Sequence, residues 1–162
     1  MIVVSDTTPI ISLIKINRLD LLEELFTEVL IPDAVFRELT TNTIFANEAQ
    51  IVKSSPFLKI SSVQNKKALQ LLQTVSGLDD GESEAIILAD ELKASVLVMD
   101  ERKGRKVAQK MGIKITGTVG ILIQAYDEKK ISADDVKSYL TQLKNSNIRL
   151  SESLIQQALD LL

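Results

Sequence analysis

The chain has 162 residues, of which 45% are hydrophobic, and its formal net charge is −3. A chain of this length is typically one domain with a single core. It contains no cysteine and no histidine, which excludes disulfides, thiolate zinc sites and any triad or general base that needs histidine. Chemistry must therefore use oxygen ligands, hydroxyls, lysine or arginine, and oxygen ligands suit magnesium, manganese or calcium.

The first residues, Met1-Ile2-Val3-Val4-Ser5-Asp6, lack the basic start of a signal peptide and reach a charge early. No window approaches the ~20 apolar residues of a membrane span, so we expect no association with a membrane. The absence of cysteine fits the reducing cytosol, and we expect a cytoplasmic protein.

Short β-branched runs alternate with helical segments along the chain. This alternation predicts an α/β fold with a central parallel sheet and right-handed crossovers. The expected strands cover residues 2–5, 28–31, 57–61, 95–99 and 113–116. The expected helices cover residues 13–25, 33–40, 66–75, 82–92, 103–111 and 119–126.

Two regions depart from this alternation. Residues 41–50 are expected to begin as a loop, continue as a helix and act as a flap. Residues 133–143 and 152–161 are amphipathic and predict a C-terminal helical hairpin. We therefore divide the chain into a domain at residues 1–127 and a hairpin at residues 128–162 that packs on the same domain. The alternative is that the hairpin forms a dimer interface or a groove for a protein partner.

Acidic residues follow two of the expected strands. Asp6 comes after the strand at residues 2–5, and Asp100 comes after the strand at residues 95–99. Open α/β sheets place their ligands at the carboxyl edge, so these carboxylates are candidate ligands of a hard divalent cation. The alternative role of Asp6 is to cap the following helix.

Other acids lie within or at the start of expected helices. Asp79 and Glu82 match the pattern of a capping box, which is a purely structural role. Glu82 and Glu84 are about 200° apart around a helix, so both cannot face one pocket. We favour Glu82 as a ligand, because small residues share its face, and we expect Glu84 to support the site without binding the metal itself. Glu38 lies in the expected helix at residues 33–40, where the ordinary role of a glutamate is that of a solvated side chain.

Hydroxyl groups accompany the strand-end acids. Thr7 or Thr8 can hold the carboxylate of Asp6 in position without binding the metal itself. Thr118 lies in the turn Thr116-Gly117-Thr118-Val119-Gly120. It can cap the following helix or offer its hydroxyl and nearby N–H groups to a phosphate.

Four segments of the chain resemble motifs of the PIN-domain nucleases. They are VSDTTPIISL at residues 4–13, LIPDAVFREL at residues 30–39, DGESEAI at residues 80–86 and LVMDER at residues 97–102. The resemblance is to the group called DUF3368, which is related to VapC-type toxins, and it runs from residue 1 to about Tyr126. It implies a three-layer α/β/α fold and an acidic cluster that binds one or two magnesium or manganese ions to hydrolyse RNA.

Matched by position, the acids of the family correspond to Asp6, Glu38, Glu82 and Asp100. Glu82 stands where the family usually has an aspartate, and Glu84 competes with it for that place. We expect Asp6, Glu82 and Asp100 to hold the metal and Glu38 to orient the attacking water.

The resulting hypothesis is a divalent-metal-dependent endoribonuclease that serves as the toxin of a toxin–antitoxin pair. Its expected partners are RNA, an antitoxin and a second copy of the chain in a homodimer. Basic side chains that can guide the RNA backbone are Arg102, Lys103, Arg105 and Lys106. The alternatives are that these side chains form a solvated helix face, and that the protein is a non-catalytic PIN-like module which binds nucleic acid or a partner.

Overall fold

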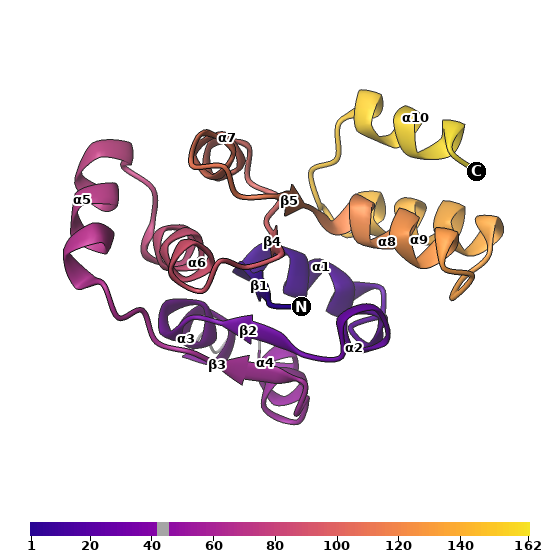
Figure 1. Cartoon of the computed structure of the whole chain (residues 1–162). Helices are drawn as coiled ribbons and strands as arrows, with labels where there is room; N and C mark the ends of the chain where they lie inside the picture. The colour runs from indigo at the N-terminus through magenta and orange to yellow at the C-terminus, as the bar shows by residue number, and fades with distance from the viewer. Residues whose placement is uncertain (42–45) are drawn as a thin grey trace.

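The structure, a computed structural model, describes residues 1–41 and 46–162. Its strands are β1 (Val3–Ser5), β2 (Val29–Ile31), β3 (Leu58–Ile60), β4 (Val96–Val98) and β5 (Ile115–Thr116). They pair in parallel in the order β3-β2-β1-β4-β5 (Figure 1). Successive strands are added on one side of β1 and then on the other, so the order reverses between β1 and β4. Such a switch point is where open α/β sheets bind their ligands.

Helices cover both faces of this sheet. They are α1 (Thr7–Lys15), α2 (Asp20–Phe26), α3 (Asp33–Thr41), α4 (Ala46–Lys53), α5 (Lys66–Ser76), α6 (Asp80–Glu91), α7 (Arg102–Lys110), α8 (Thr118–Asp127), α9 (Ala133–Asn145) and α10 (Glu152–Asp160). Because neighbouring strand residues point to opposite faces, Val3 and Val98 join one core with α1, α2, α8 and α9, whereas Val4 and Leu97 join a second core with α6 and α7 (Figure 1). This arrangement confirms the expected α/β/α fold.

The expected helix at residues 13–25 is wrong, because two helices occupy this part of the chain. Helix α1 begins at Thr7, and α2 ends at Phe26. Between them Asn17 has a positive φ of 56°, a left-handed conformation that asparagine tolerates better than most residues. Pro9 is accepted within α1 because the first four N–H groups of a helix have no partner inside it.

The remaining expected elements are present, and their ends differ by at most two residues from those expected. Helix α4 begins in the second part of the expected flap at residues 41–50 and ends three residues beyond it, at Lys53. Residues 42–45, which belong to its expected loop, lie outside the described residues. Within the described residues, no helix is long and apolar enough to cross a membrane.

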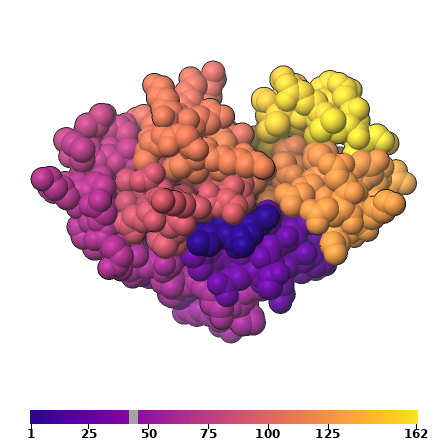
Figure 2. Space-filling model, in the orientation of Figure 1, coloured from indigo at the N-terminus to yellow at the C-terminus, as the bar shows by residue number. Residues whose placement is uncertain are grey.

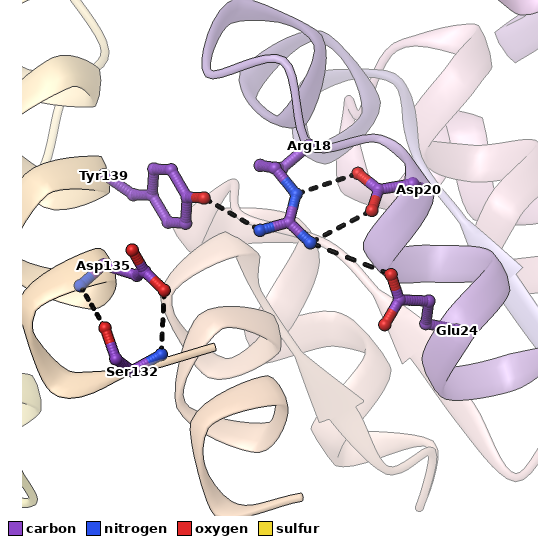
Figure 3. Close-up of polar contacts among 6 residues, drawn as sticks. All are labelled: Arg18, Asp20, Glu24, Ser132, Asp135 and Tyr139. Atoms are coloured by element: carbon purple, nitrogen blue, oxygen red, sulfur yellow. Dashed lines mark hydrogen bonds and ion pairs between the residues drawn. The ribbon is translucent and has the colours of Figure 1, made fainter. Parts of the chain in front are cut away.

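The C-terminal helices pack on the rest of the chain. Helix α9 lies against α8 and α1, and α10 lies against α8. Arg18, in the turn between α1 and α2, donates a hydrogen bond of 2.8 Å to the hydroxyl of Tyr139 in α9 and two of 3.0 Å to Asp20 (Figure 3). The same guanidinium lies 5.6 Å from the centre of the Tyr139 ring. Arg18 therefore ties α9 to the start of the chain.

Candidate functional site

Asp6 lies where β1 passes into α1, beside the end of β4. Its backbone N–H donates to the carbonyl of Val98 at 2.9 Å. The residue occupies the N-cap position of α1, but its side chain makes no capping hydrogen bond, and only 4% of its surface is exposed. The structure therefore gives Asp6 a buried carboxylate at the switch point that is not used as a helix cap.

Burial raises the pKa of Asp6 to about 7. The backbone N–H of Thr7 opposes this rise, and the negative charges of Glu82, Asp79 and Glu38 add to it. Because like charges disfavour ionisation and a nearby cation favours it, these four acids form an environment that attracts a cation. We call Asp6, Glu38, Asp79 and Glu82 the acid cluster.

Glu38 reaches the acid cluster from α3. The hydroxyl of Thr7 donates a 2.6 Å hydrogen bond to its Oε2, so Thr7 holds Glu38 rather than Asp6. Gly81, the second residue of α6, packs against the same carboxylate, because a Cβ at Gly81 would lie 2.5 Å from Oε1 of Glu38. Burial also raises the pKa of Glu38, and the hydrogen bond from Thr7 opposes it. Thr8, which was expected to share the role of Thr7, is exposed.

Glu82 reaches the acid cluster from the first turn of α6. It forms the expected capping box with Asp79: Oδ1 of Asp79 accepts from the Glu82 N–H at 2.8 Å, and Oε2 of Glu82 accepts from the Asp79 N–H at 3.2 Å. Burial raises the pKa of Glu82, and the charges of Asp79, Glu101 and Glu38 raise it further. Glu82 thus caps a helix and contributes charge to the cluster at the same time.

Glu84 has a different set of partners from Glu82. It is 9% exposed, and its Oε1 accepts from the backbone N–H of Ala34 at 3.2 Å. Its Oε2 lies 3.9 Å from a guanidinium nitrogen of Arg37. These contacts join α6 to the first turn of α3, which is a structural role.

Asp100 lies beyond the end of β4 and is held by the start of α8. Its Oδ1 accepts from the Thr118 N–H at 2.7 Å, and its Oδ2 accepts from the Thr118 hydroxyl at 2.6 Å. Gly117 packs against the carboxylate, since a Cβ there would lie 2.5 Å from Oδ1. Asp100 is not among the main charges that raise the pKa values of the acid cluster. Asp100 therefore lies at the same edge of the sheet as the acid cluster, but its carboxylate is hydrogen-bonded to the start of α8.

The donor chemistry of these residues fits a hard divalent cation. All their ligand atoms are carboxylate oxygens, the kind that magnesium and manganese prefer. Within the described part of the chain, no salt bridge engages Asp6, Glu38, Glu82 or Asp100. As the side chains are placed, however, no three acidic residues among those described form a group that could hold a metal ion.

Two contributions to the site were not predicted from the sequence. Asp79 was considered only as a cap, yet its charge raises the pKa values of Asp6, Glu38 and Glu82. Glu101 caps α7 by accepting from the Lys103 N–H at 2.7 Å, and its charge raises the pKa of Glu82. Its place directly after Asp100 is the signal that could have revealed it.

The basic residues of α7 line two hollows that share Arg102. Arg102 and Arg105 line a groove that also contains Asp100, and Arg102 lines a second hollow together with Lys103, Lys106 and Glu101. Arg105 is fixed in place by a 2.8 Å hydrogen bond to the carbonyl of Met99. Arg102 therefore connects the two parts of the expected basic run.

An α/β/α sandwich with acids at its switch point defines a class of domains that act at the carboxyl edge of a parallel sheet. The chain belongs to the DUF3368 family of PIN domains, because the model of that family matches residues 2–162. The match includes both C-terminal helices, beyond the region where the motifs lie. PIN domains are in general nucleases that bind nucleic acids and typically use divalent metals. A comparison with curated proteins found no match.

Proposed function

We propose that this protein is a divalent-metal-dependent endoribonuclease. The observation that carries the proposal is the buried carboxylate of Asp6, whose pKa is raised to about 7 beside three further acids at the switch point of the sheet. Carboxylates with raised pKa values in such a place are typical of functional sites. A chain without histidine or cysteine has few other means to activate water.

Asp6, Glu82 and Asp100 would hold the magnesium or manganese ion. When bound, such an ion stabilises negative charge on phosphoryl oxygens and lowers the pKa of water. Thr7 fixes Glu38 by the 2.6 Å hydrogen bond, and Glu38 in turn orients the attacking water. Thr118 fixes Asp100 through both carboxylate oxygens, which sets the position of this ligand before the substrate arrives.

We further propose that the enzyme is the toxin of a toxin–antitoxin pair and acts as a homodimer. The resemblance of its four motifs to those of a group related to VapC-type toxins motivates this proposal. A second candidate function is a PIN-like module that binds RNA or a partner without cutting. It is favoured by the hydrogen bonds that already engage Glu82 and Asp100 and by the absence, among the described residues, of three acids placed to hold an ion.

Exchange of Glu82 and of Glu84 for glutamine tests which glutamate of α6 serves the site. Glu82→Gln should weaken manganese binding in calorimetry and lower RNA cleavage by roughly 100-fold, because removal of a transition-state stabiliser has an effect of this size. Glu84→Gln should retain both, but should lower the free energy of unfolding by about 1–2 kcal/mol, because it weakens the contact with Ala34. If Glu84→Gln alone abolished cleavage, Glu84 and not Glu82 would be the ligand.

Exchange of Gly81 for alanine tests the position of Glu38. The new methyl carbon would lie 2.5 Å from Oε1 of Glu38, which is too close, so it would displace the carboxylate and break its hydrogen bond with Thr7. We expect cleavage to fall roughly 10-fold or more, as when a group that orients a ligand is lost. Stability should change by less than about 1 kcal/mol, because alanine favours a helix and the displaced side chain is flexible. The double variant with Glu38→Asp, whose side chain is shorter, should recover part of the activity. Equal activity of Gly81→Ala and wild type would contradict this role.

A further inference from the structure

A groove lies between α7, the start of α8 and α10. Its volume is about 590 Å³, roughly that of 20 water molecules, which is far more than one phosphate needs. The surface in Figure 2 is hollowed between α7 and the yellow α10. Asp100 lines the groove, so the groove opens at the edge of the sheet that carries the acids.

Three guanidinium groups line this groove from two sides. Arg102 and Arg105 come from α7, and Arg149 comes from the segment that connects α9 with α10. In the described part of the chain, none of these three takes part in a salt bridge. The only acid among the lining residues is Asp100, and both of its oxygens already accept hydrogen bonds from Thr118. The groove therefore has an excess of positive charge.

The other lining residues suit a polynucleotide chain. The wall on α10 is formed by Ser153, Leu154 and Gln157, all of which are exposed. Ser153 and Gln157 offer hydrogen bonds to ribose and base edges, and Leu154 offers an apolar contact. Gly117 and Gly120 also line the groove, and the space beside them is filled by the side chains of Asp100 and Thr116.

We propose that this groove binds the phosphodiester backbone of single-stranded RNA and that Arg149 clamps the strand against α7. The proposal rests on the proposed function, because it places the strand beside Asp100, one of the proposed metal ligands. It assigns RNA binding to Arg102, Arg105 and Arg149, of which Arg102 also borders the hollow lined by Lys103 and Lys106. Segments far apart in the chain, residues 102–105 and residue 149, thus form one binding surface.

Equilibrium binding of a fluorescently labelled single-stranded RNA, measured by anisotropy with chelator present and at several salt concentrations, tests the proposal. The chelator separates binding from metal-dependent cleavage. Arg149→Gln should weaken binding roughly fivefold at about 0.1 M salt and reduce the salt dependence of log K by about 0.7, as loss of one phosphate contact with a single strand does. Arg149→Lys should keep most of the salt dependence. Lys137→Gln, the same change of charge on the exposed face of α9, should bind as the wild type does.

Two results would overturn the proposal. One is that Arg149→Gln and Lys137→Gln bind the RNA with equal affinity and equal salt dependence, or that neither of them nor the wild type binds it. The other is binding of an acidic peptide, but not of RNA, that depends on Arg149. If RNA binding does not depend on Arg149 but the wild type still cuts RNA with manganese, only the groove proposal fails. If RNA binding depends on Arg149 but no cleavage occurs, only the proposed function fails.

Discussion

Replacement of Asp6 by asparagine is expected to stabilise the fold at neutral and alkaline pH. The pKa of this carboxyl rises from 3.8 to about 7 on folding, so the folded protein keeps a proton that the unfolded chain releases. One pKa unit corresponds to about 1.4 kcal/mol, and the ionised Asp6 therefore destabilises the fold by up to roughly 4 kcal/mol. Asparagine has no charge and avoids this destabilisation.

The pH dependence has a definite sign. Below pH 3.8 Asp6 is protonated in both states and contributes nothing. Between pH 3.8 and about 7 the folded state binds more protons than the unfolded state, so wild-type stability falls as the pH rises. Above about pH 7 Asp6 is ionised in both states, so its contribution to the free energy of unfolding no longer changes with pH. Asp6→Asn should therefore match the wild type near pH 4 and exceed it by about 2–4 kcal/mol at pH 8.

Urea unfolding at pH values from 4 to 8, in the presence of chelator, measures this difference. The matched control is Asp90→Asn, since Asp90 is an exposed residue of α6 and its replacement should leave the pH profile unchanged. A constant offset between Asp6→Asn and wild type over the whole range would contradict the raised pKa of Asp6.

Local sequence patterns were sufficient to predict the sheet and the position of its acids. The apolar runs before Asp6 and Asp100 indicate buried strands, and parallel strands bring their carboxyl ends to one edge. The capping box of Asp79 and Glu82 follows from helix geometry alone. For these features the neighbours in the chain determine the structure.

Other features depend on contacts between distant segments and could not be predicted in this way. Thr7 was expected to fix Asp6, but its hydroxyl reaches Glu38, which lies 31 residues further along the chain. The approach of Gly81 to Glu38 and of Gly117 to Asp100 likewise joins separate elements. Helix propensity also failed near Asn17, whose left-handed backbone follows the end of α1 while the neighbouring Ile16 and Leu19 are buried in the core. In each case tertiary packing decides between locally acceptable structures.

The largest effect on activity is expected for Asp6→Asn with RNA as the substrate. The buried carboxylate of Asp6 is the central ligand of the proposed site, and its loss should lower cleavage by at least about 1000-fold, near the background rate. The same variant should be more stable than the wild type at pH 8, so loss of activity cannot be attributed to unfolding.

Cleavage of a labelled RNA by wild type and Asp6→Asn, purified in parallel and free of other proteins, tests the central claim most directly. Manganese or magnesium should permit cleavage by the wild type and chelator should abolish it, while Asp6→Asn should leave the RNA intact under every condition. Equal metal-dependent cleavage by both proteins would show that Asp6 is not needed for it and contradict the claim. So would intact RNA with the wild type at all metal concentrations, a result that would favour the non-catalytic module if RNA is bound.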